Sequence, residues 1–211
     1  MIPKQLFFIW LGNTPPSYCQ FAINAFKDVN PDFKVDFLYW SIEDIEDPKD
    51  EILKSSVEDA IKLNRKDRKF VQAVTNLYRY KILYRYGGIY LDCDTFPVRP
   101  FDDKLLDHTE FDVTISWGQN QFIIRDVFFL GKCPKTYLEK NPPKYTLLYP
   151  HTETGKYHEL KKKFFDCTLK YGEYYGDPKL YYINHYHDFT WNPKNLRTPL
   201  CKWDEILKVK K

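Results

Sequence analysis

Hydrophobic and polar positions follow two different periods at the start of the chain. Residues 6–10 form a continuous apolar run closed by Gly12 and two prolines, and such a run is typical of a strand buried on both faces of a sheet. Apolar residues then recur at helical spacing over residues 17–29, until Asn30-Pro31 ends the pattern. From residue 34 to residue 40 polar and apolar positions alternate, which predicts a second strand. These segments together predict a β-α-β unit and therefore an α/β fold.

Two further helices are predicted from apolar periodicity, over residues 50–63 and residues 69–86. The second helix has its expected core residues at helical intervals, at Val71, Val74, Tyr78 and Ile82. It ends at Gly87-Gly88, where a left-handed cap favours glycine, and residues 89–94 are expected to form the next strand. The other expected elements are strands at residues 111–116, 127–130 and 180–184, a helix at residues 155–171 and a proline-rich crossing loop at residues 140–150.

Composition restricts the protein to a few classes. The chain has 211 residues, of which 43% are hydrophobic and 29% charged, and it contains no apolar run near the roughly 20 residues that cross a bilayer. This length suits one hydrophobic core, and no linker is long or biased enough to divide the sequence. We therefore expect a single soluble domain over residues 1–211, whether it stands alone or belongs to a longer protein.

Charge and cysteine usage limit the kinds of binding partner and the cellular compartment that we expect. The net charge of +3 is spread along the chain, which gives little reason to expect nucleic acid. The densest run, Lys161 to Lys163, is interpreted as a solvated helix face in preference to a phosphate or membrane patch. Five cysteines without a C-x-x-C pair argue against a disulfide framework or a thiolate zinc site, and the N-terminus lacks a signal-peptide pattern. A reducing, cytoplasmic location is therefore expected.

Two acidic residues, Asp92 and Asp94, end the strand predicted after the glycines. Side chains alternate along a strand, so both carboxylates are predicted on one side, with Cα atoms about 6.6 Å apart. Hard oxygen ligands at the carboxyl end of a strand suit Mg²⁺ or Mn²⁺, which share their coordination with substrate phosphates. Alone the pair is a weak signal, because such acids often cap turns. The preceding helix adds Asn76 and Arg79, and an arginine there could hold a phosphate or sugar hydroxyl unless it pairs with a surface acid.

The sequence around these acids resembles a known family. Residues 75–94, TNLYRYKILYRYGGIYLDCD, resemble the sugar-binding DxD region of family 32 glycosyltransferases and of the related catalytic domains of large clostridial glucosylating toxins. Residues 6–12 resemble the family's first strand, and residues 27–31 resemble its helix end. Thr154-Gly155 resembles a Thr-Gly-Pro segment, and residues 185–191 resemble a C-terminal His-His…Ser-Trp segment. Virus-encoded glycosyltransferase domains of the chlorella-virus type are similar as well. The resemblance implies a GT-A fold, with a mostly parallel central sheet flanked by helices.

The resemblance also implies roles for particular residues. Trp10 would stack on the base, preferably uracil, and Ile9 would touch the base through its backbone. Tyr90 would line the nucleoside pocket. The alternative is that Trp10 and Tyr90 are core residues. Asp94 would be the main metal ligand, and Asp92 would bind ribose and sugar hydroxyls directly or through the metal's waters. The residues expected at the donor nucleotide are Ile9, Trp10, Leu11, Asn76, Arg79, Tyr90, Asp92, Cys93 and Trp191. The expected ligands of Mn²⁺ or Mg²⁺ are Asp92, Asp94 and one of His185 and His187, and the expected catalytic residues are Asp92, Asp94, Arg79 and Asp126.

The implied reaction is transfer of a hexose or deoxyhexose from a UDP-sugar to a glycan or glycoprotein acceptor, with retention of anomeric configuration and no dedicated base. The cation would stabilise charge on the departing diphosphate. Thr75-Asn76 stands where the family usually shows Ser-Asp, so an amide replaces an acid that accepts hydrogen bonds from sugar hydroxyls. A donor other than glucose, such as galactose or a deoxyhexose like rhamnose, therefore becomes more credible.

Two other functions remain open at this point. A glycoside hydrolase also uses paired carboxylates, but these must flank the scissile bond, which two acids on one strand face cannot do. A nucleotide-sugar or glycan-binding module without activity would carry the same residues. A phosphate-binding NTPase is excluded, because the sequence has no G-x-x-x-x-G-K-[ST] loop.

Overall fold

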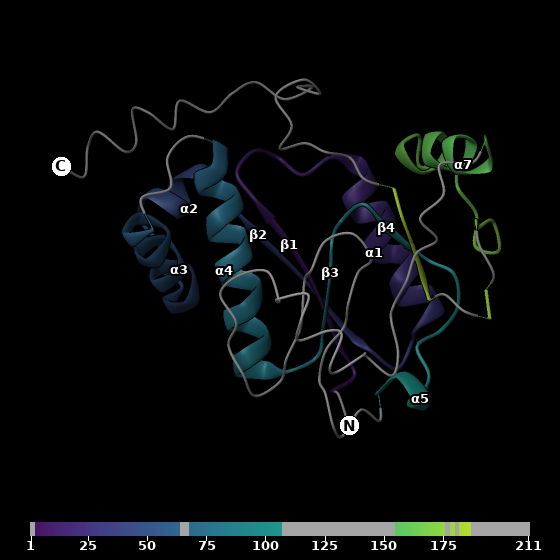
Figure 1. Cartoon of the computed structure of the whole chain (residues 1–211), viewed down its shortest axis with the longest axis horizontal. Coiled ribbons are helices and arrows are strands. Elements are labelled where there is room, and N and C mark those ends of the chain that lie inside the picture. Colours follow the sequence, from purple (N-terminus) through teal and green to yellow (C-terminus); the bar gives the residue numbers. More distant parts are fainter. Residues whose placement is uncertain (1–2, 64–67, 107–154, 176–177, 180–181, 187–211) are drawn as a thin grey trace, which may run out of the picture.

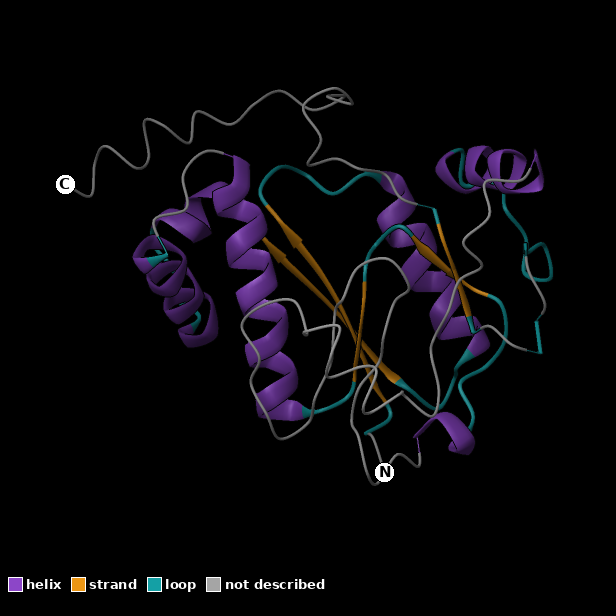
Figure 2. Cartoon of the chain, in the orientation of Figure 1, coloured by secondary structure: helices purple, strands orange, loops and turns teal. Residues whose placement is uncertain are grey.

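Three parallel strands form the central sheet of this computed structural model (Figure 2). The structure describes residues 3–63, 68–106, 155–175, 178–179 and 182–186. β1 (Gln5–Leu11) lies in the middle, β2 (Lys34–Trp40) pairs along its whole length, and β3 (Ile89–Leu91) pairs with its other side. The parallel order β2-β1-β3 confirms the α/β class expected from the sequence.

Helices cover both faces of this sheet (Figure 1). Their bounds are α1 (Ser17–Val29), α2 (Ile42–Glu46), α3 (Glu51–Lys62), α4 (Arg68–Tyr86), α5 (Asp103–Leu106) and α7 (Gly155–Phe165). Alternate residues of β1 serve two separate cores: Leu6 and Phe8 pack with α1 on one face, and Phe7 and Ile9 pack with α3 and α4 on the other. Burial on both faces is the reason that β1 is an uninterrupted apolar run.

The chain order creates a switch point beside the central strand. From β1 the chain crosses through α1 to β2 on one face of the sheet, and then returns through α2, α3 and α4 over the other face to β3. The connections that leave the carboxyl ends of β1 and β2 therefore lead to opposite faces, whereas the connection after β3 leads to β4, which packs beside α1. In open α/β sheets such a point is where ligands bind.

Two glycines bring β3 alongside β1. Gly87 and Gly88 follow α4 with φ of 67° and 96°, which is the left-handed conformation predicted for this cap. A Cβ atom on Gly88 would lie 2.6 Å from the backbone oxygen of Gln5. Glycine is therefore required here both by the backbone angle and by the close approach of β1.

A second sheet of two strands lies beside α1. β4 (Thr95–Pro97) pairs antiparallel with β5 (Ile183–His185), so that Thr95 lies opposite His185. Aromatic rings join this sheet to its neighbours: the ring centres of Phe21 and Phe96 are 5.4 Å apart, and those of Phe164 on α7 and Tyr186 are 4.9 Å apart. The pairing places His185 next to the turn that follows β3.

Most predicted elements are found close to their expected bounds. α1 and β2 have the predicted ends, while α3 and α4 differ by one residue at one or both ends. In α4 the predicted core residues Val74, Tyr78 and Ile82 are buried, and Val71 is half-buried. Strong helical or alternating periodicity over many residues made these elements predictable.

The strand predicted over residues 89–94 is too long. It ends at Leu91, because the chain turns: the carbonyl oxygen of Asp92 accepts hydrogen bonds from the backbone N–H of Thr95 at 3.2 Å and from its hydroxyl at 2.7 Å. β4 starts at Thr95 and was not predicted. The alternation of strand side chains therefore does not explain the placement of Asp92 and Asp94.

Two other predicted elements also differ. The helix expected over residues 155–171 ends at Phe165, because Cys167 adopts a left-handed φ of 55° and the N–H of Thr168 donates to the carbonyl of Lys163 at 2.8 Å. The strand expected at residues 180–184 is β5, which includes His185, and the short helix α2 was not predicted. The expected strands at residues 111–116 and 127–130 and the loop at residues 140–150 lie outside the described residues.

Among the helices that the structure describes, none combines the length and the apolar character needed to cross a membrane.

Candidate active site

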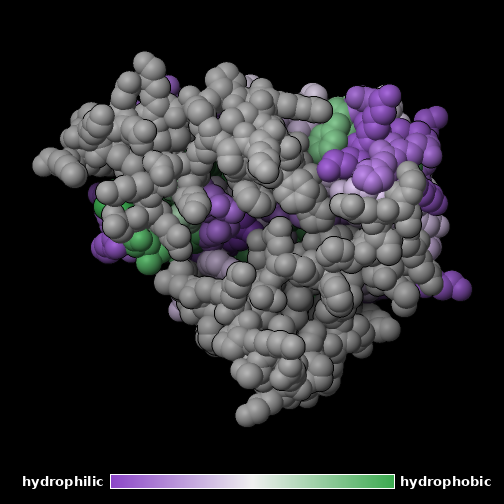
Figure 3. All heavy atoms as spheres, turned by 45° about the horizontal axis from the view of Figure 1, so that its top comes forward, coloured by the Kyte–Doolittle hydropathy of each residue, from purple (hydrophilic) through white to green (hydrophobic). Residues whose placement is uncertain are grey.

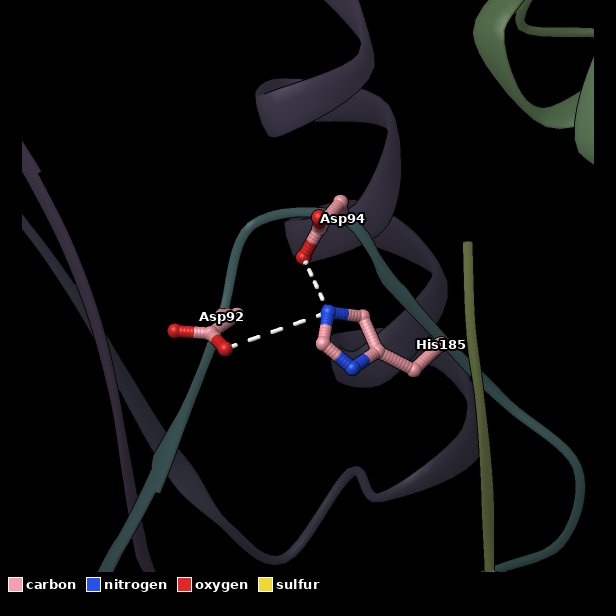
Figure 4. Close-up of side chains that lie close together, drawn as sticks. All are labelled: Asp92, Asp94 and His185. Atoms are coloured by element: carbon pink, nitrogen blue, oxygen red, sulfur yellow. Dashed lines mark hydrogen bonds and ion pairs between the residues drawn. The ribbon is translucent and has the colours of Figure 1, made fainter. Parts of the chain in front are cut away.

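The turn after β3 places two carboxylates next to one histidine (Figure 4). The Nε2 atom of His185 lies 2.8 Å from Oδ1 of Asp94 and 3.9 Å from Oδ2 of Asp92. One ligand atom from each of the three side chains lies within 4.8 Å of the others. His185 is 5% exposed, whereas the acids are half-buried. The predicted group of acids and histidine is therefore brought together, although by a turn and not by a single strand face.

The backbone around His185 holds the imidazole in place. The N–H of Tyr186 donates to the carbonyl of Asp94 at 2.9 Å, and the hydroxyl of Tyr175 donates to the carbonyl of His185 at 2.8 Å. Tyr175 is held in turn by Asn184, whose side chain accepts from the Tyr175 N–H and donates to the Tyr175 carbonyl, both at 3.0 Å. Tyr175 and Asn184 were not predicted as part of the site, and no local sequence signal identifies them.

The charge state of His185 depends on its neighbours. Burial alone would lower the pKa of the imidazole, and the positive charge of Lys161 acts in the same direction. The carboxylates of Asp94 and then Asp92 outweigh both, so the pKa of His185 is raised above its usual value. Two carboxylates with one imidazole are a donor set that suits a divalent ion such as Mn²⁺ or Mg²⁺. The residues present thus fit the predicted cation.

Asp92 is held by two further residues. The hydroxyl of Tyr90 donates to Oδ1 of Asp92 at 2.8 Å, and Nη1 of Arg79 lies 3.9 Å from the same oxygen. The guanidinium of Arg79 also lies over the ring of Tyr90, 4.6 Å from its centre. These contacts hold Oδ1, while the second carboxylate oxygen faces His185. Both Tyr90 and Arg79 are 8% exposed.

The protonation states of these two residues follow from their surroundings. Burial lowers the pKa of Arg79, but Tyr90, Asp92 and Asp94 together outweigh it and raise this pKa, so the guanidinium stays charged. Burial raises the pKa of Tyr90 well above its usual value. Tyr90 therefore remains a neutral hydroxyl that can donate to Asp92.

The end of β1 lies beside this group. Trp10 is half-buried, and its indole N–H donates to the carbonyl of Asn13 at 2.7 Å, which fixes the ring. The carbonyl of Ile9 accepts from the thiol of Cys93 at 3.7 Å, which ties β1 to the acidic turn. Leu11 is half-buried and packs with the core between the sheet and α4.

The remaining predicted site residues are placed as follows. Asn76 is half-buried on α4, one turn before Arg79. Asp126, His187 and Trp191 lie outside the described residues. The structure thus brings together Asp92, Asp94, His185, Arg79 and Tyr90, next to the end of β1 that carries Trp10.

Comparison with known proteins supports this interpretation of the acidic turn. Residues 16–112 match the family model of the glycosyltransferase sugar-binding region containing DXD motif. Within that segment, Asp92-Cys93-Asp94 has the form of the DXD motif. Residues 16–112, a little under half of the chain, are therefore similar to a DXD glycosyltransferase region. Asn76, Arg79 and Tyr90 also lie inside the matched segment, whereas Trp10 and His185 lie outside it.

A solved structure titled PaToxG Glycosyltransferase is also similar to this protein. The two are 22% identical, and the similarity has a TM-score of 0.34. It covers 47% of this chain and 45% of that chain, so it spans less than half of either. Among curated proteins, none matches the chain.

Proposed function

We propose that this protein is a metal-dependent glycosyltransferase that moves a hexose or deoxyhexose from a UDP-sugar to a hydroxyl of a glycan or glycoprotein acceptor. The observation that carries the proposal is the group of Asp92, Asp94 and His185 just beyond the carboxyl end of β3, with both acids inside the segment that matches the DXD glycosyltransferase model. Ligands of open α/β sheets bind at this place.

Asp94, His185 and Asp92 would hold the divalent ion, as Mn²⁺ or Mg²⁺. When bound, the ion supplies a Lewis acid for the negative charge that develops on the diphosphate as the glycosidic bond breaks. His185 offers its Nε2 atom toward both acids, and its backbone is held by Tyr175. The histidine is therefore oriented before any ligand arrives.

Arg79 contributes a fixed positive charge beside the carboxylates. Its guanidinium is buried against Tyr90 and stays charged, so it is suited to bind the diphosphate or a hydroxyl of the donor sugar. Tyr90 orients Asp92 through one oxygen and leaves the other for the ion or for donor hydroxyls. Because the contacts of Arg79 and Tyr90 are already formed, neither side chain has to move during the reaction.

Trp10 would bind the nucleobase. Its N–H is already used by the carbonyl of Asn13, so what the indole offers a ligand is the face of its ring. A flat apolar face stacks on a base. Uracil is our preferred base, and Asn76, an uncharged amide on the Arg79 helix, supports galactose or a deoxyhexose as readily as glucose.

Retention of configuration is part of the proposal. An acceptor hydroxyl would attack on the face that the diphosphate leaves, and a phosphate oxygen of the departing group can take its proton, so a dedicated base is not required. Asp126 remains the candidate for a side chain near the reacting carbon.

The geometry argues against hydrolysis by paired carboxylates. Hydrolases place one carboxyl on each side of the bond, about 5 Å apart or more. Here both acids approach the same nitrogen of His185, at 2.8 and 3.9 Å. A sugar cannot lie between them.

The decisive experiment measures donor turnover by the purified protein. UDP-glucose, UDP-galactose and UDP-rhamnose are each incubated with Mn²⁺, with Mg²⁺ or with chelator, and UDP release is followed together with thermal shift by UDP. We expect metal-dependent UDP release, and we expect Asp94→Asn to reduce it by at least about 100-fold, because several kcal/mol of charge stabilisation depend on the ion.

The matched control is Asp166→Asn, which neutralises an exposed carboxylate after α7 and should leave turnover unchanged. Thermal stabilisation by UDP without any turnover would support the binding module instead. Turnover that is indifferent to chelator, or no stabilisation by UDP with Mn²⁺, would contradict the proposal.

A further inference from the structure

One hydroxyl holds both backbone polar groups of His185. The N–H of Tyr186 donates to the carbonyl of Asp94, so the backbone N–H of residue 186 points toward the chain that leads into β4. Backbone groups of successive residues point to opposite sides of a strand, and those of His185 therefore point away from β4. On that side the hydroxyl of Tyr175 accepts a hydrogen bond from the His185 N–H at 3.2 Å and donates one to the His185 carbonyl at 2.8 Å.

Tyr175 is itself held by the residue that precedes His185. The side-chain oxygen of Asn184 accepts from the N–H of Tyr175, and the side-chain nitrogen of Asn184 donates to the carbonyl of Tyr175, both at 3.0 Å. All three residues are buried, so water does not readily replace these hydrogen bonds. Four hydrogen bonds thus link Tyr175 to Asn184 and His185 at the outer edge of β5.

The loop that carries Tyr175 is braced against α7. The carboxylate of Glu173, two residues before Tyr175, accepts a hydrogen bond from Nζ of Lys163 on α7 at 2.7 Å. Hydrophilic side chains gather on the outward side of α7, at the upper right of Figure 3. On its inward side the ring of Phe164 stacks on that of Tyr186, with centres 4.9 Å apart. The position of the Tyr175 hydroxyl is therefore fixed from both β5 and α7.

The direction of the imidazole depends on this backbone anchor. His185 is the last residue of β5, a strand of only three residues, so the pairing with β4 ends where the side chain must be aimed. Its Nε2 atom lies 2.8 Å from Asp94 and 3.9 Å from Asp92 (Figure 4). A rotation of the backbone at residue 185 would carry the ring away from both acids. The hydroxyl of Tyr175 opposes this rotation, because it binds the N–H and the carbonyl of the same residue.

We propose that Tyr175 is a positioning residue for the cation site, and that its hydroxyl keeps Nε2 of His185 directed at Asp94 and Asp92. This inference rests on the function proposed above and adds a residue from outside the segment that matches the DXD model. Tyr175 acts only through His185: it fixes the backbone of a ligand and does not itself contact the ion or the donor. Such supporting contacts often set metal affinity nearly as strongly as the ligands do.

The test compares Tyr175→Phe with Tyr182→Phe. Tyr175→Phe keeps the buried ring but removes both hydrogen bonds to His185. Tyr182→Phe removes another buried hydroxyl, three residues before His185, which donates to Asp102 instead. Affinity for Mn²⁺ in the presence of UDP is measured by calorimetry, and coupling of the bound Mn²⁺ to imidazole nitrogen is measured by pulsed EPR, with His185→Gln as the reference that lacks the imidazole.

For Tyr175→Phe we expect Mn²⁺ affinity to fall about 10- to 100-fold and the nitrogen coupling to weaken toward that of His185→Gln. Tyr182→Phe should keep the wild-type affinity and coupling even if its melting temperature is lower, which separates positioning from general stability. Uridine affinity without metal should be equal in all variants, because the proposed base platform, Trp10, lies on β1.

A second variant approaches the same contact from its other end. Asn184→Ala leaves the hydroxyl of Tyr175 in place but removes the two hydrogen bonds that anchor Tyr175, so we expect a smaller loss of Mn²⁺ affinity in the same direction. If Tyr175→Phe does not fold, the comparison of Asn184→Ala with Tyr182→Phe decides the question.

The outcomes separate this inference from the function on which it rests. Equal Mn²⁺ affinity for the wild type and Tyr175→Phe, or an equal loss in Tyr182→Phe, would overturn the role of Tyr175. Bound Mn²⁺ without nitrogen coupling in the wild type would also overturn it, because His185 would then not be a ligand, while binding by the two acids would still support the proposed function. A wild-type protein that binds no Mn²⁺ with UDP would overturn the proposed function, and this inference with it.

Discussion

The two carboxylate oxygens of Asp92 have different neighbours. Its Oδ1 accepts from Tyr90 and lies near Arg79, while Oδ2 faces His185. A carboxylate oriented in this way is prepared to bind a ligand through one oxygen. Residues that hold a metal ligand in place often matter almost as much as the ligand itself.

Replacing Tyr90 by phenylalanine tests this arrangement. Tyr90→Phe keeps the ring that packs against Arg79 but removes the hydrogen bond to Asp92. We expect affinity for Mn²⁺ in the presence of UDP to fall about 10- to 100-fold, measured by calorimetry. Tyr86→Phe, on a half-exposed ring at the end of α4, is the control and should not change the affinity. Equal affinities for both variants would show that the hydroxyl of Tyr90 has no positioning role.

At the residue scale, the types of side chain in the candidate site were predictable from the sequence, but the orientations of those side chains were not. Two acids, a histidine and an arginine were identified from their types and from family resemblance, and the structure brings Asp92, Asp94, His185 and Arg79 together. The contact between Tyr90 and Asp92 depends on the rotamers of both side chains and on the turn at residue 92. Neither is encoded in a short-range pattern.

The passage from α4 to β3 is the element junction on which the site depends. Gly87 and Gly88 reverse the chain within two residues, so that β3 pairs with β1 and Asp92 emerges at its carboxyl end. Both glycines have positive φ, and Gly88 lies against the backbone of Gln5.

Gly88→Ala should destabilise the protein strongly. The left-handed φ alone costs about 1–2 kcal/mol for a residue with a Cβ, and the Cβ would lie 2.6 Å from the Gln5 oxygen. Gly172→Ala is a matched control, because Gly172 has φ of 94° but nothing within 4 Å of a Cβ. Urea unfolding should therefore show a larger loss of unfolding free energy for Gly88→Ala. Equal losses in the two variants would mean that the approach of β1 imposes no requirement beyond the backbone angle.

The sequence did not predict that β4 and β5 form a small sheet. β5 was expected near its place, but β4 has only three residues, and a strand that short has no periodicity to detect. Its pairing with β5 is nevertheless what carries His185 to Asp94. The candidate site thus depends on a strand, β4, that is too short to be detected from the pattern of hydrophobic and polar residues.

Buried tyrosines shape the stability of the whole molecule. Burial, followed by the hydrogen bond to Asp102, raises the pKa of Tyr182 to about 12. Burial also raises the pKa of Tyr78 and Tyr186. In the unfolded chain these hydroxyls ionise near pH 10.

Stability is therefore predicted to fall in alkaline solution. From about pH 10 to about pH 12 the unfolded chain releases tyrosine protons that the folded chain retains, so the free energy of unfolding decreases as pH rises through this window. Below pH 10 these tyrosines are neutral in both states and contribute no pH dependence. Urea unfolding at several pH values, together with phenolate absorbance, measures the effect.

Tyr182→Phe should reduce the alkaline loss, because the phenylalanine ring does not ionise. Tyr171→Phe, at a ring that is 55% exposed, should leave the loss unchanged. A constant unfolding free energy across the window would show that Tyr182 ionises equally in both states.

The amino-acid sequence by itself determined the α/β class, most of the helices and strands that the structure describes, and the types of residue that we propose to bind a divalent ion and a nucleotide. These properties depend on periodicity and on the chemistry of single side chains, which are local. Tertiary structure alone decided that His185 meets the acids, that Tyr90 holds Asp92 and that Tyr157 of α7 contacts Tyr186 beside His185. Tyr90 and Asp92 are two residues apart and meet through the turn at residue 92, whereas the packing of β5 and α7 brings residues from far along the chain to the acids.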